Sequence, residues 1–437
     1  MHLPEHVQNC IDTLQQRGFA CYAVGGCVRD AYLGLTPHDY DLCTDALPDD
    51  IRTAFSDCTL VLAGEKHGTV GVVTEQGVVE ITTFRTEGDY TDSRHPGWVT
   101  FVTSIEDDLA RRDFTVNAMA YSPDCGLIDP FGGMQDLKNH VLRAVGDAQT
   151  RFNEDALRIL RGVRFSVRYR LTPEAATREA MLSNAALLNN IAVERIFEEL
   201  CKLLPLVDAN DLLSYSPILT QIIPELAATI GFAQHSKHHA YDVFSHTAQV
   251  CAATAPDLTL RWAALLHDIG KIPTFTLDDA GQGHFYGHAQ VSAQMADDIL
   301  HRLKAPTALR EDVVFLITHH MDAIEPDKKL LRRYLSRWGL ARVDRLLALQ
   351  QADFCSKGVT GAFFPFEEIH AAVQAVLDEN NCLRISDLAI DGHDMLALGL
   401  SGPAIGNCLQ QLLDQVIDEK IPNERAALLA AAERISL

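Results

Sequence analysis

The sequence has few basic residues for its length: 37 lysines and arginines stand against 59 aspartates and glutamates, for a formal net charge of −22 at pH 7. This shortage argues at first sight against a nucleic-acid partner, because phosphate backbones are normally met by lysine and arginine. The argument fails if the basic residues are concentrated in one place. Residues 153–171 concentrate them.

Long apolar runs and paired-cysteine motifs are also absent. No apolar run approaches the length of a membrane span, so we expect no membrane partner. The 11 cysteines are scattered without C-x-x-C spacing, and the N-terminal residues lack the basic and apolar regions of a signal peptide. We therefore expect free thiols in a reducing compartment and a soluble, cytoplasmic protein.

The chain of 437 residues is too long for one ordinary hydrophobic core. Its first part contains short β-branched runs punctuated by glycine, whereas almost everything from residue 212 onward has helical periodicity. The sequence predicts an α+β fold, with a mixed-sheet head followed by an all-α neck, body and tail. The strands expected after residue 50 are 59–62, 68–74 and 78–84, and the regions expected are 1–145 (head), 146–206 (neck), 207–382 (body) and 383–437 (tail).

Residues 22–41, YAVGGCVRDAYLGLTPHDYD, read as strand, turn, helix and strand. Asp39 and Asp41 are separated by one residue, and on a strand such side chains project from the same face. They are therefore candidate ligands for a divalent metal. The glycine pair that ends at Gly26 lets the backbone approach a bound group, and the helix start with Arg29 favours an anion such as phosphate. Metal carboxylates beside a phosphate site indicate a nucleotide.

Three more residues of the head are candidates for the same site. Glu80, in the strand expected at 78–84, is a candidate third acidic group; an exposed glutamate at a strand edge is the alternative. Arg111 and Arg112 follow two acids on a predicted helix, and adjacent arginines of this kind are usually a solvated face.

Residues 153–171, NEDALRILRGVRFSVRYRL, contain five arginines and no acid after position 155. We expect a helix with Asn153 as its N-cap, one basic face and one buried face. A charged helix face exposed to solvent normally carries both signs, so the absence of acid favours a polyanion as partner. The five are Arg158, Arg161, Arg164, Arg168 and Arg170.

Asp155 lies one turn before Arg158, which suggests a way to read a nucleobase. A carboxylate accepts from an exocyclic amine, and a guanidinium donates to the adjacent ring nitrogen. Cytosine and adenine present this amine and acceptor, whereas guanine and uracil present a carbonyl and a ring N–H. If both side chains converge on one base edge, the pair selects C and A over G and U.

A second group of candidate ligands is spread over the helical part of the chain. Histidines and aspartates on successive predicted helices can converge on one mixed nitrogen and oxygen site for a divalent transition metal or Mg²⁺. A helical core with a vestigial site is the alternative. The constellation contains His246, His267, Asp268, His284, His288, His319, His320 and Asp353. From it we assign His246, His267, Asp268 and Asp353 as ligands, followed by His288 and His319.

The motifs GGCVRD with HDYD, RRDFTVNA, DPFGG and EDALRILR resemble, in this order and at these distances, the bacterial tRNA nucleotidyltransferase and poly(A) polymerase group, the class II nucleotidyltransferases. The segments HTAQV, LLHDIGK and GHFYGH resemble the HD metal-dependent phosphohydrolase domain that many bacterial CCA-adding enzymes carry. Together the two resemblances span most of the chain.

The resemblance implies that Asp39 and Asp41 hold two Mg²⁺ ions for transfer of nucleotides to the end of tRNA. It implies that Asp155 and Arg158 select CTP and then ATP, and that neck, body and tail hold the tRNA acceptor arm by shape and phosphate. Nucleotide-binding roles fall to Gly26, Arg29, one or both of Arg111 and Arg112, Arg161 and Arg164, and we assign Arg168 and Arg170 to RNA binding.

Several alternatives stay open. A poly(A) polymerase shares the head motifs, but the acidic balance and the pair His267-Asp268 count against it. An enzyme that adds only CC or only A shares the template motif. The polar, aperiodic loop 86–97 is similar to the flexible loop of full CCA enzymes, which favours complete addition. An HD phosphohydrolase with an RNA-binding remnant as its head is contradicted by intact Asp39 and Asp41. A secondary phosphatase or cyclic phosphodiesterase activity is expected in the body.

Overall fold

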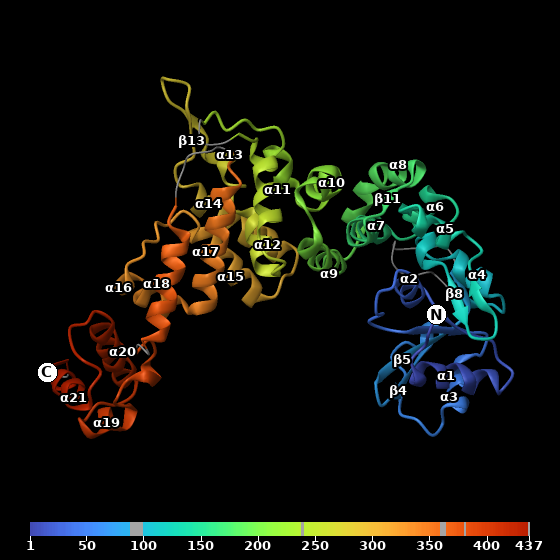
Figure 1. Ribbon diagram of the computed structural model, residues 1–437, viewed down its shortest axis with the longest axis horizontal. Helices are drawn as coiled ribbons and strands as arrows, with labels where there is room; N and C mark the ends of the chain where they lie inside the picture. Colours follow the sequence, from blue (N-terminus) through green and yellow to red (C-terminus); the bar gives the residue numbers. More distant parts are fainter. Residues whose placement is uncertain (88–98, 237–239, 359–363, 380–381, 436–437) are drawn as a thin grey trace. The chain divides into compact units, whose positions relative to one another are not determined.

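The computed structural model describes residues 1–87, 99–236, 240–358, 364–379 and 382–435. The chain divides into two compact units, residues 1–227 with 302–304 and residues 228–301 with 305–437. The first unit combines strands with helices, and the described part of the second is helical apart from one small hairpin (Figure 1). The predicted α+β fold, with its mixed-sheet head and helical remainder, is confirmed.

A mixed sheet of seven strands is the framework of the first unit. All neighbouring strands are antiparallel except β2 and β5, which run parallel. In spatial order the strands are β3 (Leu60–Val61), β4 (Thr69–Thr74), β5 (Gly77–Thr83), β2 (Asp41–Thr44), β1 (Cys21–Val24), β8 (Ala120–Ser122) and β9 (Gly126–Ile128). The predicted strands at 68–74 and 78–84 are confirmed, and the one at 59–62 is reduced to two residues.

Helices cover both faces of this sheet. α1 and α3 pack on one face through β1, β4 and β5, whereas Ile105 and Leu109 of α4 join the apolar cluster on the other face. The helices of this region are α1 (Glu5–Gln15), α2 (Gly26–Tyr32), α3 (Pro48–Ala54), α4 (Ile105–Ala110) and α5 (Gly133–Lys138), with the short turns η1 (Glu65–His67) and η2 (Thr115–Asn117).

The sheet register determines where the first candidate metal ligands lie. Asp41, the first residue of β2, is the direct partner of Glu80 on the parallel strand β5. Directly opposed residues project from the same face of a sheet. Cys43 and Phe84 follow Asp41 and Glu80 on the same face, and they belong to the apolar cluster that also contains residues of α4. Because β5 lies inside the sheet, Glu80 is not a residue of an edge strand.

The helix expected to carry Arg111 and Arg112 is shorter than predicted. Ser104 caps α4 by accepting from the backbone N–H of Asp107, and the helix ends at Ala110. Both arginines therefore lie in the turn that follows. The prediction placed the helix too late because it took the acids at 107 and 108 as residues before the helix, whereas they lie within it.

The helix boundary predicted at Asn153 is wrong. Asn153 lies inside α6 (Ala148–Glu154), which Asp147 caps. The chain leaves the helical conformation at Asp155, whose φ is −139°, and α7 (Leu157–Tyr169) begins after it. The Asp155 carboxylate accepts from the N–H of Leu157 at 3.1 Å, a local bond that competes with continuation of the preceding helix.

The predicted loop 86–97 falls largely outside the described residues. Its first two residues belong to β6 (Arg85–Glu87), which pairs antiparallel with β7 (Val99–Phe101). Further along the first unit are β10 (Val141–Leu142), β11 (Thr172–Pro173), α8 (Ala175–Ser183), η3 (Ala185–Asn190), α9 (Val193–Leu203), η4 (Leu204–Leu206), α10 (Ala209–Ile222) and η5 (Pro224–Thr229).

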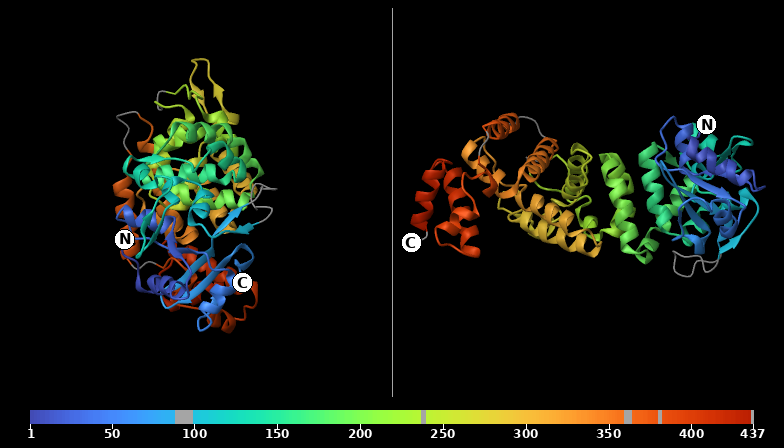
Figure 2. Two further views of the ribbon diagram at one scale, coloured as in Figure 1. Left: turned by 90° about the vertical axis from the view of Figure 1, so that its right-hand side faces the viewer. Right: turned by 90° about the horizontal axis from the view of Figure 1, so that it is seen from below.

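The second unit is built around α12 (Leu258–Leu266), a helix that is apolar on nearly all sides. Such a helix is stable only when it is surrounded, and α11, α15 and α17 pack against it. Figure 2 shows this helical part, coloured from yellow-green to orange, in two further views. The helices are α11 (Val243–Ala253), α12 (Leu258–Leu266), α13 (Lys271–Thr274), α14 (His288–Arg302), α15 (Thr307–His319), α16 (Lys328–Trp338), α17 (Leu340–Cys355) and α18 (Phe366–Asp378), with the hairpin β12 (Thr276–Leu277) and β13 (Gly283–His284). No described helix is long and apolar enough to cross a membrane.

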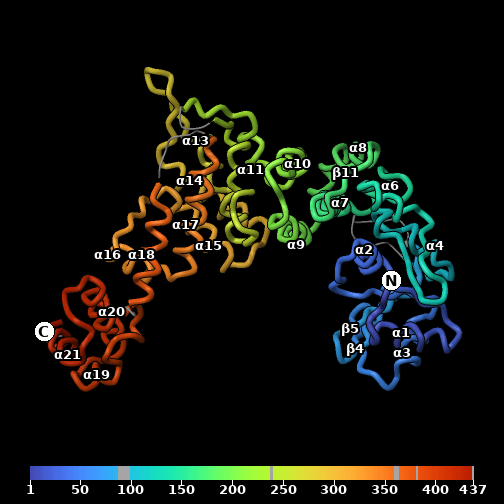
Figure 3. Tube along the Cα trace, viewed as in Figure 1, coloured from blue at the N-terminus to red at the C-terminus, as the bar shows by residue number. Residues whose placement is uncertain are grey.

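The last part of the second unit has a hydrophobic core of its own. Met395, Leu412 and Leu428 are fully buried in a cluster that contains only residues from Cys382 onward. The elements are η6 (Ile385–Asp387), α19 (Gly392–Ala397), α20 (Pro403–Ile417) and α21 (Arg425–Ile435), which lie together in the chain trace (Figure 3). This separate core makes the segment a small packed region rather than an extension of α18.

Candidate functional site

A cleft of about 700 Å³ in the first unit gathers most of the residues predicted to bind a nucleotide. Its walls come from the turn between β1 and α2, from β2, from the turn after α4 and from α7. The predicted site residues in its lining are Gly26, Arg29, Asp41, Arg111, Arg112, Asp155, Arg158, Arg161 and Arg164. Asp39, Glu80, Arg168 and Arg170 lie outside this lining.

Three carboxylates influence one another at the β2 end of the cleft. Loss of hydration raises the pKa of Asp41; the Arg112 guanidinium lowers it, and the negative charges of Glu80 and Asp39 raise it again, with a net upward shift. Asp39 is exposed and precedes β2 instead of lying on it, so the expectation of two aspartates on one strand face is corrected. A set of carboxylate oxygens with mutual repulsion suits a hard cation such as Mg²⁺.

Arg29 is held by partners from three elements. Its Nε donates to Asp30 at 2.8 Å, Nη1 donates to the side-chain oxygen of Asn117, and Nη2 donates to the hydroxyl of Tyr169. The guanidinium carbon also lies 4.2 Å from the centre of the Tyr169 ring. These contacts fix a buried positive charge beside the glycine turn.

Glycine is favoured at position 25 by the positive φ of its backbone, and a second arginine lies close to it. Gly25 has a φ of 72°, and a Cβ there would lie 2.7 Å from Nη1 of Arg112. Arg112 and Arg111 both pair with the fully buried Asp108. Burial alone would raise the pKa of Asp108, but the two guanidinium groups outweigh burial and lower it. The arginines are therefore an anchored part of the cleft, not a solvated face.

Most of the arginines of α7 and its C-terminal end form ion pairs, although residues 156–171 contain no acid. Four of the five form ion pairs, mainly with acids from other elements. The pairs are Arg158 with Glu154 (2.7 Å), Arg161 with Asp113 (2.8 Å), Arg164 with Glu199 (2.6 Å) and Arg170 with Asp208 and Asp211 (3.1 and 3.0 Å). The premise that these arginines lack acidic partners is wrong. Glu154, the partner of Arg158, lies just before the stretch without acids, and the partners of the other three arginines are distant in sequence and invisible to a local pattern.

Asp113 and Asn117 are functional candidates that the sequence analysis missed. The buried Asp113 accepts from Nε of Arg161 at 2.8 Å and from the amide of Asn117 at 2.9 Å. Burial raises the pKa of Asp113, but Arg161 and Asn117 outweigh burial and hold it at about 2. Since Asn117 also accepts from Arg29, one chain of bonds links α2 to α7. Both residues belong to the motif RRDFTVNA, in which the sequence analysis gave a role only to the two arginines.

The predicted base-reading pair lines the same cleft. Asp155 forms an ion pair with Arg195 of α9 at 3.0 Å, and Arg158 donates to the backbone oxygen of Arg111 at 3.0 Å as well as to Glu154. Each member of the pair is therefore oriented by a neighbour. Arg195 also lines the cleft and was not predicted.

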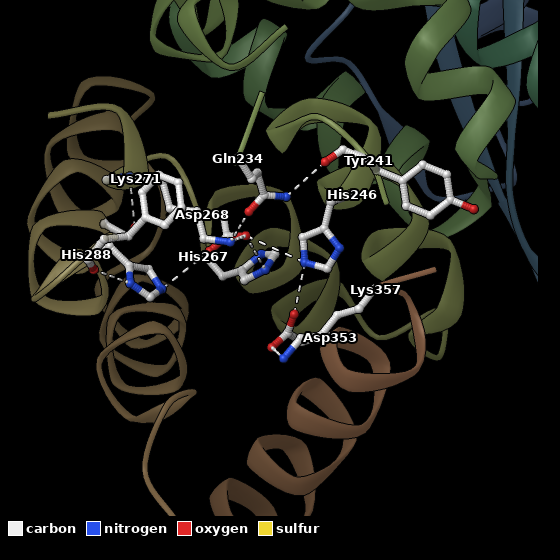
Figure 4. Close-up of polar contacts among 12 residues, drawn as sticks. Gln234, Tyr241, His246, His267, Asp268, Lys271, His288, Asp353 and Lys357 are labelled. Atoms are coloured by element: carbon white, nitrogen blue, oxygen red, sulfur yellow. Dashed lines mark hydrogen bonds and ion pairs between the residues drawn. The ribbon is translucent and has the colours of Figure 1, made fainter. Parts of the chain in front are cut away.

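A second cluster forms in the second unit, where α11, α14, α17 and the C-terminal ends of α12 and α15 bring histidines and aspartates together. Figure 4 shows His246, His267, Asp268, His288 and Asp353 of this cluster. Ligand atoms of His246, His267 and Asp268 lie within 4.8 Å of one another, as do those of Asp268, His288 and His320. Asp353 of α17 accepts from Nε2 of His246 at 2.9 Å. The predicted residues His246, His267, Asp268, His288 and Asp353 thus lie together.

The histidine ring orientations suit a metal. Nδ1 of His267, His288 and His320 each lies 2.6–2.9 Å from a backbone oxygen three residues earlier. Each Nδ1 therefore carries the hydrogen, and the neutral form of each ring has a lone pair on Nε2. Nε2 of His288 lies 3.3 Å from Nε2 of His320, and burial lowers the pKa of His320 to about 4. Two facing lone pairs are stabilised by a cation between them.

His320 takes the place expected for His319. Nδ1 of His319 lies 2.6 Å from a carboxylate oxygen of Asp322, and its ring packs 4.8 Å from that of Trp338. The buried residues of α15 are at positions 313, 316 and 317. Continuing this helical spacing leads to 320, so the burial pattern contained the signal that separates the two histidines.

The cluster opens into a cleft of about 410 Å³. Lys271, which lines it, is buried and lies 2.7 Å from a carboxylate oxygen of Asp268. Nζ of Lys271 also donates to Gln234, whose amide donates to the backbone oxygen of Tyr241 (Figure 4). A positive group is thus fixed between the metal-ligand candidates and the open cleft.

Comparisons with known proteins agree with the nucleotide cleft and with the cluster of histidines and aspartates. Family models match residues 21–143 (poly A polymerase head domain), 170–230 (probable RNA and SrmB-binding site of polymerase A) and 238–356 (HD domain). A CCA-adding enzyme of Levilactobacillus brevis is 36% identical over 98% of both chains. The chain belongs to the CCA-adding enzymes. It is thus a tRNA nucleotidyltransferase. The head-domain match includes the glycine turn and Asp41 of the nucleotide cleft, and the HD-domain match includes the cluster of histidines and aspartates.

Two more CCA-adding enzymes show how far the similarity extends. That of Geobacillus thermodenitrificans is 40% identical over 62% of this chain and 67% of its own length. The crystal structure of the Bacillus stearothermophilus enzyme in complex with CTP is 29% identical, with a TM-score of 0.71 over 100% of this chain and 98% of that one. Similarity in fold therefore extends over the whole chain.

Replacing His319 or His320 with alanine tests which of the two neighbouring histidines is a metal ligand. The HD cluster consists of His246, His267, Asp268, His288, His320 and Asp353. We expect His320→Ala to weaken binding of Mn²⁺ or Zn²⁺ at this cluster by at least about tenfold, because it removes the Nε2 atom that faces His288. His319→Ala is the matched control and should leave the affinity unchanged. Isothermal titration of metal-stripped full-length protein measures both. Equal affinities of wild type and His320→Ala would contradict the assignment.

Proposed function

We propose that the chain adds the 3′-terminal CCA of tRNA from CTP and ATP without a nucleic-acid template. The observation that carries this proposal is one cleft that combines carboxylates, anchored arginines and the pair Asp155 and Arg158. The CCA-adding relative that matches 98% of the chain, and the solved relative in complex with CTP, support it.

The carboxylates are proposed to act at the reacting bond. Two Mg²⁺ ions held by Asp39 and Asp41, with Glu80 as a third acid, would activate the terminal ribose hydroxyl and neutralise the triphosphate. The hydroxyl oxygen forms a bond to the α-phosphorus, the bond to pyrophosphate breaks, and the hydroxyl proton is lost. Asp41 and Glu80 support this role because their register places both carboxylates on one face of the sheet.

The anchored arginines are proposed to orient the triphosphate. Arg29 and Arg112 lie beside Gly25 and Gly26, where the turn exposes backbone to the cleft. Their positions are fixed by Asn117, Tyr169 and Asp108 before any ligand binds. Pre-ordered charges stabilise a transition state without reorganisation, which suits transfer of a phosphoryl group. Arg111, Arg161 and Arg164 are proposed to complete the nucleotide site.

Selection of C and A is assigned to Asp155 and Arg158. The Asp155 carboxylate would accept from the exocyclic amine of the base, and Arg158 would donate to the adjacent ring nitrogen. Arg195 holds the carboxylate from one side, and Glu154 holds the guanidinium from the other. A side chain with a fixed orientation discriminates better than a mobile one, because the wrong base then leaves both groups unsatisfied.

The rest of the chain is proposed to bind the tRNA acceptor arm, with the boundaries 1–145 for the head, 146–206 for the neck, 207–382 for the body and 383–437 for the tail. Arg168, exposed on α7, and Arg170 are the residues that we assign to RNA. A cytoplasmic location fits the cysteines, all 11 of which are free thiols.

The HD cluster favours a second activity, metal-dependent hydrolysis of phosphate esters. His246, His267, Asp268 and Asp353 would hold a divalent metal, with His288 and His320 as further ligands. A metal there would supply an activated water. The Nε2 atoms of His267, His288 and His320 suit a transition metal better than Mg²⁺. The cleft lined by His288 and His320 gives a substrate access to them.

CCA addition is tested with tRNA that lacks its last three nucleotides. Wild-type protein should stop at CC with CTP alone and complete CCA with CTP and ATP, read on a sequencing gel. Asp41→Ala should slow addition at least about 1,000-fold, whereas Asp57→Ala, an exposed acid of the head outside the cleft, should not. Arrest at CC with both nucleotides present would exclude complete addition.

Base selection is tested by competing all four nucleotides. Asp155→Ala and Arg158→Ala should each erode the preference for C and A over U and G by about tenfold or more, because one partner of the base edge is lost. Arg178→Ala, which removes an exposed arginine of the neck outside the cleft, is the matched control. Unchanged selectivity in the first two variants would refute the template role.

The second activity is tested with phosphomonoesters and 2′,3′-cyclic nucleotides under a series of divalent metals. His267→Ala and Asp268→Asn should abolish hydrolysis, since both ligands are central to the cluster. The same variants should still add nucleotides to tRNA, which checks their folding. A wild-type protein that hydrolyses none of these esters with any metal would rule the activity out.

A further inference from the structure

An aromatic pair stands at the mouth of the HD cleft. The Tyr286 ring stacks on the His284 ring with centroids 5.2 Å apart and an interplanar angle of 7°. Tyr286 is nevertheless 77% exposed, the most exposed of the large hydrophobic side chains in the described residues. Both rings line the cleft together with Asp268 and His288. A tyrosine that served only packing would be covered.

The inner ring of the pair is fixed in place. Nε2 of His284 lies 3.0 Å from a carboxylate oxygen of Asp278, and Nδ1 lies 3.3 Å from the Tyr286 hydroxyl. Asp278 is itself held, because it accepts from the backbone N–H groups of Ala280 and Gln282 at 3.0 and 2.8 Å. The hairpin of β12 and β13 therefore presents a braced ring, and the outer face of Tyr286 is left for a ligand.

The pair lies next to the proposed hydrolytic centre. Tyr286 precedes His288 by two residues, and the metal-ligand candidate His288 is the first residue of α14. Lys271 and Lys357 also line the cleft, within 2.7 and 3.7 Å of carboxylate oxygens of Asp268 and Asp353. The cleft thus offers cations and metal ligands at its base and a flat aromatic surface at its mouth. A ligand with a phosphate at one end and a planar ring at the other matches both.

We propose that His284 and Tyr286 form a stacking platform for a nucleobase, so that the HD site binds nucleotide phosphates more tightly than phosphate esters without a base. The proposal rests on the hydrolytic function proposed above for the same cleft. Stacking on an aromatic ring tolerates every base, because each has a π-face. The phosphate would lie toward Lys271 and the metal ligands. Water oxygen bonds to phosphorus, the bond from phosphorus to the ribose oxygen breaks, and that oxygen takes a proton.

Binding to metal-free protein tests the platform without turnover. Isothermal titration with 3′-AMP in the presence of a chelator uses full-length protein that carries Asp155→Ala in every sample, which weakens the other nucleotide site. Tyr286→Ala should weaken binding about 5- to 100-fold. Tyr286→Phe keeps the ring and should bind like the parent. Leu277→Ala, an exposed residue of the same hairpin outside the cleft, is the matched control.

Two results would overturn the platform: unchanged 3′-AMP affinity in Tyr286→Ala, or equal losses in Tyr286→Phe and Tyr286→Ala. The metal-loaded protein then provides the comparison of esters. Tyr286→Ala should raise KM for 3′-AMP and leave hydrolysis of glycerol 2-phosphate unchanged. If wild type hydrolyses neither ester, the hydrolytic function fails while the titration still decides the platform. If both esters are hydrolysed and Tyr286→Ala alters neither, the platform alone fails.

Discussion

A buried carboxylate, Asp113, connects the parts of the nucleotide cleft. It bonds to Arg161 of α7 and to Asn117, and Asn117 bonds in turn to Arg29 of α2. An ionised group away from water is stable only while it is paired and hydrogen-bonded. The low pKa of Asp113, about 2, shows that its partners more than offset its burial. This ionised group therefore helps to fix the position of α7 relative to the glycine turn, together with the direct bond from Arg29 to Tyr169.

The pairing of charges also explains how an acidic chain can present an anion site. Arg158, Arg161 and Arg164 line the cleft, yet each is bonded to an acid. These acids orient the guanidinium groups, and a bound triphosphate can use the N–H groups that point into the cleft. Net charge describes the whole surface, whereas binding depends on the local arrangement. The total of −22 therefore carries no information about this cleft.

Sequence patterns predicted the features that depend on neighbours along the chain. The α+β class followed from periodicity, and most of the nucleotide residues lie in short motifs that fold into one cleft. Patterns failed where a partner lies far away. Glu199 pairs with Arg164 across 35 positions, and nothing local to α7 reveals it. The break between α6 and α7 was missed because one side-chain bond, from Leu157 N–H to Asp155, decides it. His320 differs, since the burial spacing of α15 already pointed to it.

The two clusters differ in donor atoms, and this difference can keep their metals apart. The head offers carboxylate oxygens of Asp39, Asp41 and Glu80, which hard cations prefer. The HD cluster offers imidazole nitrogens of His267, His288 and His320, and nitrogen donors bind first-row transition metals far better than Mg²⁺. Burial strengthens the contrast, because it lowers the pKa of His320 to about 4 and keeps that ring neutral at physiological pH. In the proposed function, the chemistry of its own ligands would then select the ion at each of the two sites.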